Sequence, residues 1–213
     1  MLVLGIETAT PQVGVAIGGH EGVLASFHSA RDRRHAETLA PAIRFVTEQA
    51  RIELSEISVI AVDVGPGLFT GMRVGLATAK ALAHALRVPM IPVSSLDLVA
   101  FPVRYCSRRI VAVLDARRGE VFHAAYRQVP GGIQRRTEPQ VALPTELAGD
   151  LDAHGEDALL VGDGAVRYAE QLRARVGVEI GERDLQYPSA QSLVQLAHAA
   201  ALRENWVNPW EVE

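Results

Sequence analysis

The sequence predicts an α/β protein made of two similar lobes, each built on a mixed sheet. The first observation is a pattern of strand, acid, turn and strand that occurs twice, around Glu7 in "LVLGIETATPQVGVAI" and around Asp115 in "RIVAVLDARRGEVFHAAY". The second is an apolar strand that runs into an Asp-containing glycine turn and a helix, in residues 58–75 and again in residues 158–176. Because the repeat spans about half the chain, it is too long for a solenoid and indicates two lobes.

The first lobe opens with three short apolar or alternating segments, Leu2–Ile6, Gln12–Ile17 and Gly22–His28. Thr-Pro and Gly-Gly breaks separate them, which predicts an antiparallel meander of three strands. Ile57–Val64 is a continuous β-branched run, the pattern of a strand buried on both faces. Met90–Val93 then predicts a further parallel strand.

Two helices are predicted between these strands. The first covers about residues 37–51, because apolar side chains recur there at helical spacing. Pro41 stands near its start, where a missing N–H costs little. The second covers about residues 70–86 and directly follows the glycine turn of residues 65–71.

The boundary between the lobes is expected to be a tight crossover near residues 101–107, because no linker rich in Gly, Ser and Pro separates them. The predicted domains are therefore 1–103 and a smaller 104–213. A last helix beginning near Ala190 would cover its own lobe or pack back on the first one. The tail "NWVNPWEVE" is expected to be irregular.

Composition excludes several classes of protein. The chain has 213 residues, 48% hydrophobic and 22% charged, which is ordinary for a globular protein. A net charge of −4 gives no general positive field for binding nucleic acid unaided. The single cysteine, Cys106, cannot form an internal disulfide and suits a reducing compartment. With no basic leader and no apolar run near the ~20 residues that span a bilayer, we expect a cytoplasmic protein without membrane attachment.

Two lobes that each begin with a hairpin and deliver an acid from its first strand are the arrangement of the actin, sugar-kinase and Hsp70 ATPase (ASKHA) class. Hairpin turns hold nucleotide phosphates in that class, so nucleotide chemistry needs testing at the site itself. The glycine turn reads G-x-G-x-x-x-G and lacks the lysine of a P-loop. Whether it is a phosphate site or only the start of a helix stays open here.

Small residues recur every four positions along the predicted helix of residues 70–86. They are Gly71, Gly75, Ala79 and Ala83. Glycine inside a helix costs up to about 1 kcal/mol relative to alanine, so something is expected to pack closely against this strip. That neighbour is either another element of the same lobe or a partner subunit.

Other catalytic constellations are weaker. No two of the seven histidines have the i, i+4 spacing of a helical zinc site, and no G-x-S-x-G elbow occurs. Asp115 and Glu120 would either bind a metal-bound phosphate or act as solvated turn acids beside Arg117 and Arg118. The basic clusters at residues 31–34 and 104–109 are interpreted as solvated faces.

Several segments together resemble one family. They are "IETATPQVGVAI", "HAETLAP", "GPGLFTGMRVGLATAKALA", "VPMIPVSSLDLVA" and "LDARRGEVF". The chain is similar over these segments to the TsaB (YeaZ) family of tRNA threonylcarbamoyladenosine (t6A) biosynthesis proteins, densely from Met1 to about Tyr126. Glu7 stands where the family usually has Asp, and Leu68 where it usually has Ser, which weakens a phosphate-binding role at both positions.

The resemblance implies an ASKHA-fold pseudoenzyme with no catalytic residue of its own. TsaB proteins form a heterodimer with TsaD, which transfers threonylcarbamoyl to the adenosine beside the tRNA anticodon, assisted by the ATPase TsaE. tRNA would be met only through the complex. In the segment similar to the metal-binding V-N-H-[LI]-E-[AG]-H of TsaD, Ser95 and Val99 stand at the histidine positions, which implies no metal site. No cofactor of its own is implied, and ATP or ADP at the heterodimer junction is left open.

The resemblance places the partner interface on the helices of about residues 37–51 and 70–86, within the first predicted domain. The candidate interface residues are His35, Glu37, Leu39, Ile43, Thr70, Gly71, Arg73, Val74, Gly75, Thr78, Ala79 and Leu82. Gly75→Arg is then expected to leave the monomer folded and to abolish partner binding. Candidate nucleotide-binding residues are Glu7, Thr8, Gly65, Gly67, Asp115, Gly119 and Glu120.

Parts of the sequence are also compatible with two other functions. A stand-alone ASKHA ATPase or small-molecule kinase is supported by the duplicated acids and opposed by the missing phosphate signatures. A peptidase is suggested by the glycoprotease label of the wider family, but no metal pair, serine elbow or activated cysteine supports it. Homodimerisation of the isolated chain through the same face is a further hypothesis.

Overall fold

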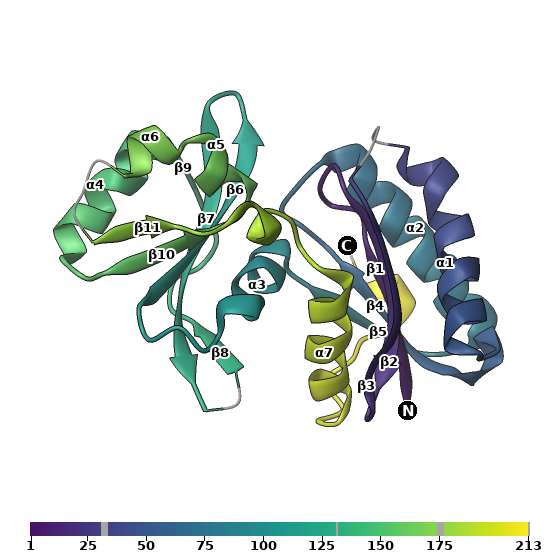
Figure 1. Ribbon diagram of the computed structural model, residues 1–213. Helices are drawn as coiled ribbons and strands as arrows, with labels where there is room; N and C mark the ends of the chain where they lie inside the picture. Colours follow the sequence, from purple (N-terminus) through teal and green to yellow (C-terminus); the bar gives the residue numbers. More distant parts are fainter. Residues whose placement is uncertain (31–33, 131, 174–176, 213) are drawn as a thin grey trace. The chain divides into compact units, whose positions relative to one another are not determined.

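The first sheet has five strands in the order β3-β2-β1-β4-β5 (Figure 1). The strands are β1 (Leu2–Glu7), β2 (Val13–Gly19), β3 (Gly22–Ser29), β4 (Ile57–Asp63) and β5 (Met90–Val93). β1, β2 and β3 form the expected antiparallel meander, whereas β1 with β4 and β4 with β5 are parallel pairs. The computed structural model describes residues 1–30, 34–130, 132–173 and 177–212, so the basic cluster at 31–34 lies outside the described residues except for Arg34.

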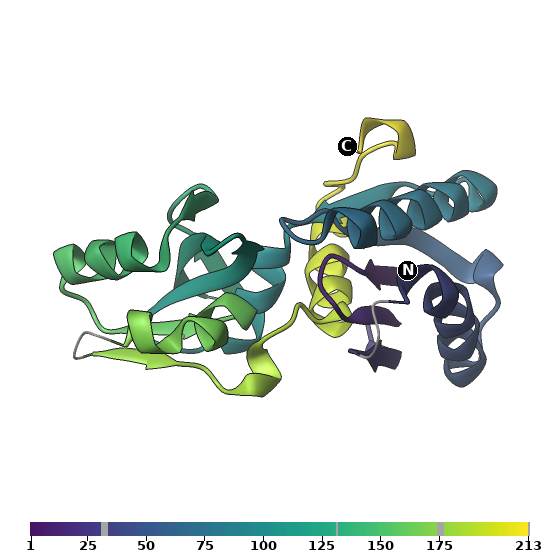
Figure 2. The ribbon, with the colours of Figure 1, turned by 90° about the horizontal axis from the view of Figure 1, so that it is seen from above.

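Helices cover both faces of this sheet. α1 (His35–Ala50) and α2 (Phe69–Leu86) lie on one face, and α7 (Ala190–Ala201) lies on the other (Figures 1 and 2). Gly5 and Gly18 let α7 approach the strands, because a Cβ added at either would lie 3.0 or 2.9 Å from a methyl group of Val194. Burial on both faces explains the continuous apolar run of β4.

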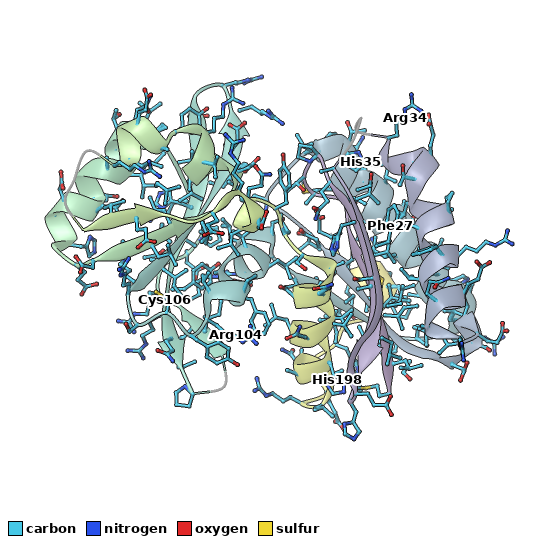
Figure 3. The ribbon with its side chains drawn as sticks, viewed as in Figure 1. Phe27, Arg34, His35, Arg104, Cys106 and His198 are labelled. Atoms are coloured by element: carbon cyan, nitrogen blue, oxygen red, sulfur yellow. The ribbon has the colours of Figure 1, made fainter. Side chains whose placement is uncertain are left out.

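α1 begins two residues earlier than the sequence suggests, so Pro41 lies inside the helix rather than in its first turn. Pro41 is exposed. Because proline has no backbone N–H, the helix lacks one hydrogen bond on its solvent side. The inner face of α1 is apolar and fully covered, with Leu39 and Val46 at most 2% exposed. Phe27 of β3, labelled in Figure 3, packs edge-on against Phe45 of α1 with ring centroids 6.1 Å apart.

The second sheet repeats the order of the first, since its path is β11-β10-β6-β7-β8, with β9 also pairing with β7. The strands are β6 (Arg109–Arg117), β7 (Glu120–Val129), β8 (Gly132–Arg135), β9 (Gln140–Ala142), β10 (Ala158–Val161) and β11 (Val178–Ile180). The first strand of each hairpin also has a parallel neighbour, since β1 pairs in parallel with β4 and β6 with β10. The predicted duplication of mixed-sheet lobes is therefore confirmed.

Helices are shorter in the second half of the chain. They are α3 (Ser95–Ala100), α4 (Pro144–His154), α5 (Asp163–Arg167) and α6 (Ala169–Leu172). The predicted helix after the second glycine turn is broken at Tyr168, where the backbone leaves the helical region. Short 3-10 turns lie at Leu54–Glu56, Phe101–Val103, Arg183–Leu185 and Pro209–Glu211.

The chain divides into two units, Met1–Ser95 with Ser189–Glu213, and Leu96–Pro188. This differs from the expected division at residue 103, because Leu96, Val99 and Ala100 of α3 join the core around Ile110 and Tyr126. The C-terminal segment belongs to the first unit, where α7 packs on the sheet.

The tail is more ordered than the sequence suggests. Val207 exchanges two backbone hydrogen bonds of 2.9 Å with Met90 at the edge of β5. Val212 is 3% exposed and joins the core of the first unit. Pairing with a sheet edge supplies hydrogen bonds that the local sequence could not reveal.

Cys106 is half-buried beside the apolar core of the second unit, in the region labelled in Figure 3. Over the ranges that the structure describes, no helix combines the length and apolar character needed to cross a membrane.

Candidate functional site

The glycine turn between β4 and α2 lies directly on the turn between β1 and β2. A Cβ added at Gly67 would stand 2.1 Å from the carbonyl oxygen of Ala9, and the Leu68 N–H donates to that oxygen at 2.6 Å. A Cβ added at Gly71 would stand 2.1 Å from the carbonyl oxygen of Thr8. The glycines are therefore required by the close approach of two backbones.

Side chains complete this contact. The Thr8 hydroxyl donates to the Gly71 carbonyl at 2.8 Å, and a Cβ added at Gly75 would lie 2.2 Å from that hydroxyl oxygen. His35 Nε2 at the start of α1 lies 2.8 Å from the Thr10 carbonyl oxygen (Figure 3). We call this set of contacts the Thr8 junction, and its residues are Thr8, Ala9, Thr10, His35, Gly67, Leu68, Gly71 and Gly75. It shows that the small-residue strip of α2 packs against an element of its own lobe.

Two acids lie beside the junction. Glu7 is completely buried and accepts hydrogen bonds from the Ala9 N–H at 2.9 Å and from Gln12 Nε2 at 3.3 Å. Asp63 accepts from the Gly65 N–H at 2.8 Å and from the Ser95 hydroxyl at 2.6 Å. Burial, and then the charge of Asp63, raise the pKa of Glu7 well above 4.5.

Glu7→Gln is expected to flatten the pH dependence of stability. Because the folded protein holds the Glu7 proton more tightly than the unfolded chain, the contribution of Glu7 to stability is fully present below about pH 4.5 and is lost as pH rises through the folded-state pKa. Denaturant unfolding between about pH 5 and pH 9 would measure it. The variant should lose part of that fall, whereas exposed Glu170→Gln should keep it. Equal slopes in wild type and Glu7→Gln would contradict the assignment.

The equivalent acid of the second unit is paired within that unit. The Asp115 side chain is 3% exposed and forms ion pairs with Arg117 at 3.1 Å and Arg167 at 3.0 Å. Tyr168 donates to it at 3.4 Å. Asp115 therefore lies beside Arg117 as the sequence suggests, but its side chain is buried rather than solvated. The sequence did not indicate Arg167 and Tyr168 as its partners, because they lie about 50 residues away.

The remaining nucleotide-binding candidates are backbone positions and one more acid. Gly119 has a φ of 86° and closes the β6–β7 hairpin, in which Glu120 stands opposite Arg117 in the strand register. Glu7, Thr8, Gly65 and Gly67 lie together in the first unit, whereas Asp115, Gly119 and Glu120 lie in the second. A nucleotide-binding role for either group stays a prediction.

Half of the expected interface residues face inward. The buried ones are His35, Leu39, Ile43, Gly71, Gly75 and Ala79. The expectation for Gly75→Arg is accordingly wrong: the new side chain would clash with Thr8 inside its own unit, so the monomer itself would be damaged. The others stay accessible: Glu37, Thr70 and Arg73 are exposed, and Val74, Thr78 and Leu82 are half-buried.

On the exposed side of these two helices, the sequence indicated only Glu37, Thr70 and Arg73. We call the part of that side within residues 36–45 and 69–81 the outer face, and it consists of Ala36, Glu37, Ala40, Pro41, Arg44 and Phe45 of α1 with Phe69, Thr70, Arg73, Ala77 and Ala81 of α2. Phe69 is 63% exposed and Phe45 46% exposed. The Arg73 guanidinium lies 4.0 Å above the Phe69 ring. Small and apolar side chains therefore dominate a solvent-facing surface.

The segment expected to lack a metal site has structural partners at each position. Ser95 bonds to Asp63, and Val99 is 1% exposed in the core of the second unit. Between them, Asp97 accepts from the Tyr126 hydroxyl at 2.8 Å and from Arg135 at 2.6 Å. In the described part of the chain, no three or more His, Cys, Asp or Glu side chains gather as metal ligands would.

Comparisons with known proteins identify the family to which the chain is similar. The model of the TsaD family, described as tRNA N6-adenosine threonylcarbamoyltransferase, matches residues 22–209. The tRNA threonylcarbamoyladenosine biosynthesis protein TsaB of Escherichia coli (strain K12) is 29% identical over 200 residues, covering 92% of this chain and 86% of that protein. The Bacillus subtilis (strain 168) protein of the same name is 26% identical over 84% of this chain and 78% of its own length.

Solved structures give the same assignment. YeaZ from Pseudomonas aeruginosa matches with a TM-score of 0.85 and 27% identity, over 99% of this chain and 97% of that one. ROK hexokinase from Thermus thermophilus shares the ASKHA-type fold alone. It matches with a TM-score of 0.51 and 12% identity, over 96% of this chain and 100% of that one. Because the family model spans most of the chain and YeaZ matches it nearly end to end, this protein belongs to the TsaD family of that model and, within it, to the TsaB/YeaZ group.

Proposed function

We propose that this chain takes part in t6A formation as a non-catalytic subunit that binds and activates the transferase TsaD, with TsaE as the assisting ATPase. The TsaB relatives, named for t6A biosynthesis, support the pathway. tRNA would be modified by the complex, and the cytoplasm is its place of action. ATP or ADP would enter only at the junction with TsaD.

The Thr8 junction is the observation that carries the non-catalytic assignment. A phosphate cradle needs free backbone N–H groups and open space at a helix N-terminus. Here the Leu68 N–H already donates to Ala9, and the space above Gly67 and Gly71 holds the backbone of the β1–β2 turn. The lobe therefore uses its glycine turn for packing.

The neighbouring acids support the same assignment. Glu7 is buried and hydrogen-bonded, and Asp115 is neutralised by two arginines of its own unit. A carboxylate that binds a metal-bound phosphate needs lone pairs directed at the ligand. These two acids direct theirs at the protein.

The outer face is the surface that we assign to TsaD. Its small side chains would allow close approach of two helix pairs, and Phe45 and Phe69 would supply buried apolar area. Of the residues expected from the sequence, Glu37, Thr70 and Arg73 belong to it. The inward-facing six contribute by holding α1 and α2 in place.

A reconstituted reaction tests the proposal. TsaD, TsaE, ATP, unmodified tRNA and threonylcarbamoyl-adenylate should form t6A only when this chain is added, and the chain alone should turn over no ATP. Mass spectrometry of digested tRNA would measure the product. Nucleotide turnover by the chain alone would instead support a stand-alone ATPase or kinase, and product formation without the chain would remove its activating role.

A further inference from the structure

The second unit contains a cavity that the proposed function does not use. It has a volume of about 200 Å³ and lies between β6, β7, β9 and α4. Its apolar walls are Val111, Ala125, Leu147 and Leu151, all at most 3% exposed. This volume is several times the ~30 Å³ that one water molecule occupies in the liquid, so the cavity has room for a ligand of several heavy atoms.

Strand register explains why two basic side chains line this cavity. Val111 pairs with Ala125 and Val113 with His123, so these four lie on one face of the β6–β7 pair. Arg109 comes two residues before Val111 and therefore shares that face. Arg109 and His123 both line the cavity. The cluster at residues 104–109 is thus not wholly a solvated surface, because it includes Arg109.

Two polar atoms of the cavity have no hydrogen-bond partner in the described structure. They are Arg109 Nη1 and His123 Nε2, and both atoms are buried. His123 as a whole is only 6% exposed. A buried donor that lacks a partner costs about 1–3 kcal/mol, and more when it is charged. Two such atoms on residues that line one cavity are therefore available to hydrogen-bond a ligand bound there.

Charge at the cavity selects the kind of ligand. Arg109 contributes a permanent positive charge and Asp150 of α4 a carboxylate, so the excess of positive charge comes from the arginines of the adjoining groove. Burial lowers the pKa of His123, Asp150 raises it and Arg109 lowers it further. The ring is then neutral at neutral pH and can donate one hydrogen bond from Nε2.

A wider basic groove of about 930 Å³ adjoins the cavity and shares Arg109, Thr137 and His154 with it. Arg127 and Arg136 also line this groove, as do Glu156, Asp157 and Arg108, which is ion-paired with Glu179. Arg127 donates to the amide oxygen of Gln134 at 2.7 Å. Because the amide is neutral, this hydrogen bond does not compensate the positive charge of Arg127. An anion approaching through this groove would be attracted toward Arg109.

We propose that this cavity binds the terminal phosphate of a small phosphate monoester, with Arg109 Nη1 and His123 Nε2 as its two buried donors. The groove would hold the rest of the molecule between Arg127 and Arg136. A terminal phosphate suits the site because it can enter a closed cavity end-on, whereas a phosphodiester continues in both directions. This site is independent of the outer face and of the partner proposed above.

Calorimetric titration tests the site on the full chain. Inorganic phosphate and glycerol 3-phosphate are expected to bind, and Arg109→Gln and His123→Phe should each weaken binding about tenfold or more, since a charge-assisted hydrogen bond contributes that much. Arg183→Gln is the matched control, because this exposed arginine of the same unit lies outside the cavity and groove lining. Circular dichroism would confirm that each variant is folded.

A second measurement avoids the variants altogether. In wild-type protein, NMR of the histidine ring nitrogens should show the His123 Nε2 resonance shifting as phosphate is added. No shift at millimolar phosphate, or unchanged affinity in both folded variants, would overturn the site.

The source of the phosphate is tested in a separate arm. Dimethyl phosphate, and an oligoribonucleotide without a terminal phosphate, mimic the RNA backbone and should bind much more weakly than glycerol 3-phosphate. If either bound equally well and competed with inorganic phosphate, the groove would be an RNA contact and the monoester site would be rejected.

Discussion

Gly71→Ala is expected to lower the free energy of unfolding by about 2–3 kcal/mol. The added methyl group would stand 2.1 Å from the Thr8 carbonyl oxygen, which is a backbone atom and cannot rotate away. Overpacking of this kind costs about 1–3 kcal/mol, and the displaced Thr8 hydroxyl would lose its hydrogen bond to the Gly71 carbonyl, worth about 1 kcal/mol. The better helix propensity of alanine offsets up to about 1 kcal/mol of this loss. Denaturant unfolding followed by circular dichroism would measure the change.

Gly149→Ala is the matched control, because it makes the same substitution in a helix where nothing lies within 4 Å of the new Cβ. Propensity alone should then stabilise the protein, by up to about 1 kcal/mol. Gly75→Ala should fall between the two, since the atom it meets is the rotatable Thr8 hydroxyl. Equal effects of Gly71→Ala and Gly149→Ala would show that the Thr8 junction is not tightly packed.

Ala77→Arg is expected to leave the monomer as stable as wild type and to weaken binding to TsaD at least about a hundredfold. Ala77 is exposed in the middle of the outer face, so an arginine there has room in the monomer. At a closely packed helix contact, the same side chain would have to be buried with an unpaired charge, which costs about 3 kcal/mol or more. Surface plasmon resonance with immobilised TsaD would measure the affinity, and t6A formation should fall in parallel.

Ala199→Arg makes the same change on α7, on the opposite face of the same sheet. It should preserve both binding and t6A formation, which separates loss of the interface from a general effect of added charge. Wild-type affinity in Ala77→Arg would remove the outer face as the interface while leaving the function itself to the reconstituted reaction. Loss of binding in both variants would show that added charge, rather than position, was responsible.

Sequence alone determined the elements whose information is local. The short apolar hairpin strands, the continuous apolar run of β4 and the helical spacing of α1 each follow from side-chain burial along one short segment. The repeat of strand, acid, turn and strand was enough to predict two similar lobes, and the structure shows that their sheets have the same strand order. Family motifs then identified the TsaB/YeaZ group, as the comparisons confirm.

Only the tertiary structure decided what approaches each of these elements. The strip at Gly71 and Gly75 shows in the sequence that something lies close, but the identity of Thr8 as that neighbour depends on a contact across 63 residues. Likewise Asp115 accepts a hydrogen bond from Arg167, which lies 52 residues away, and Val207 pairs with Met90 through the backbone. The cavity at Arg109 and His123 exists because strand register puts both side chains on one face. Periodicity records how much of a side chain is buried, whereas the partner that buries it is fixed only when distant segments pack together.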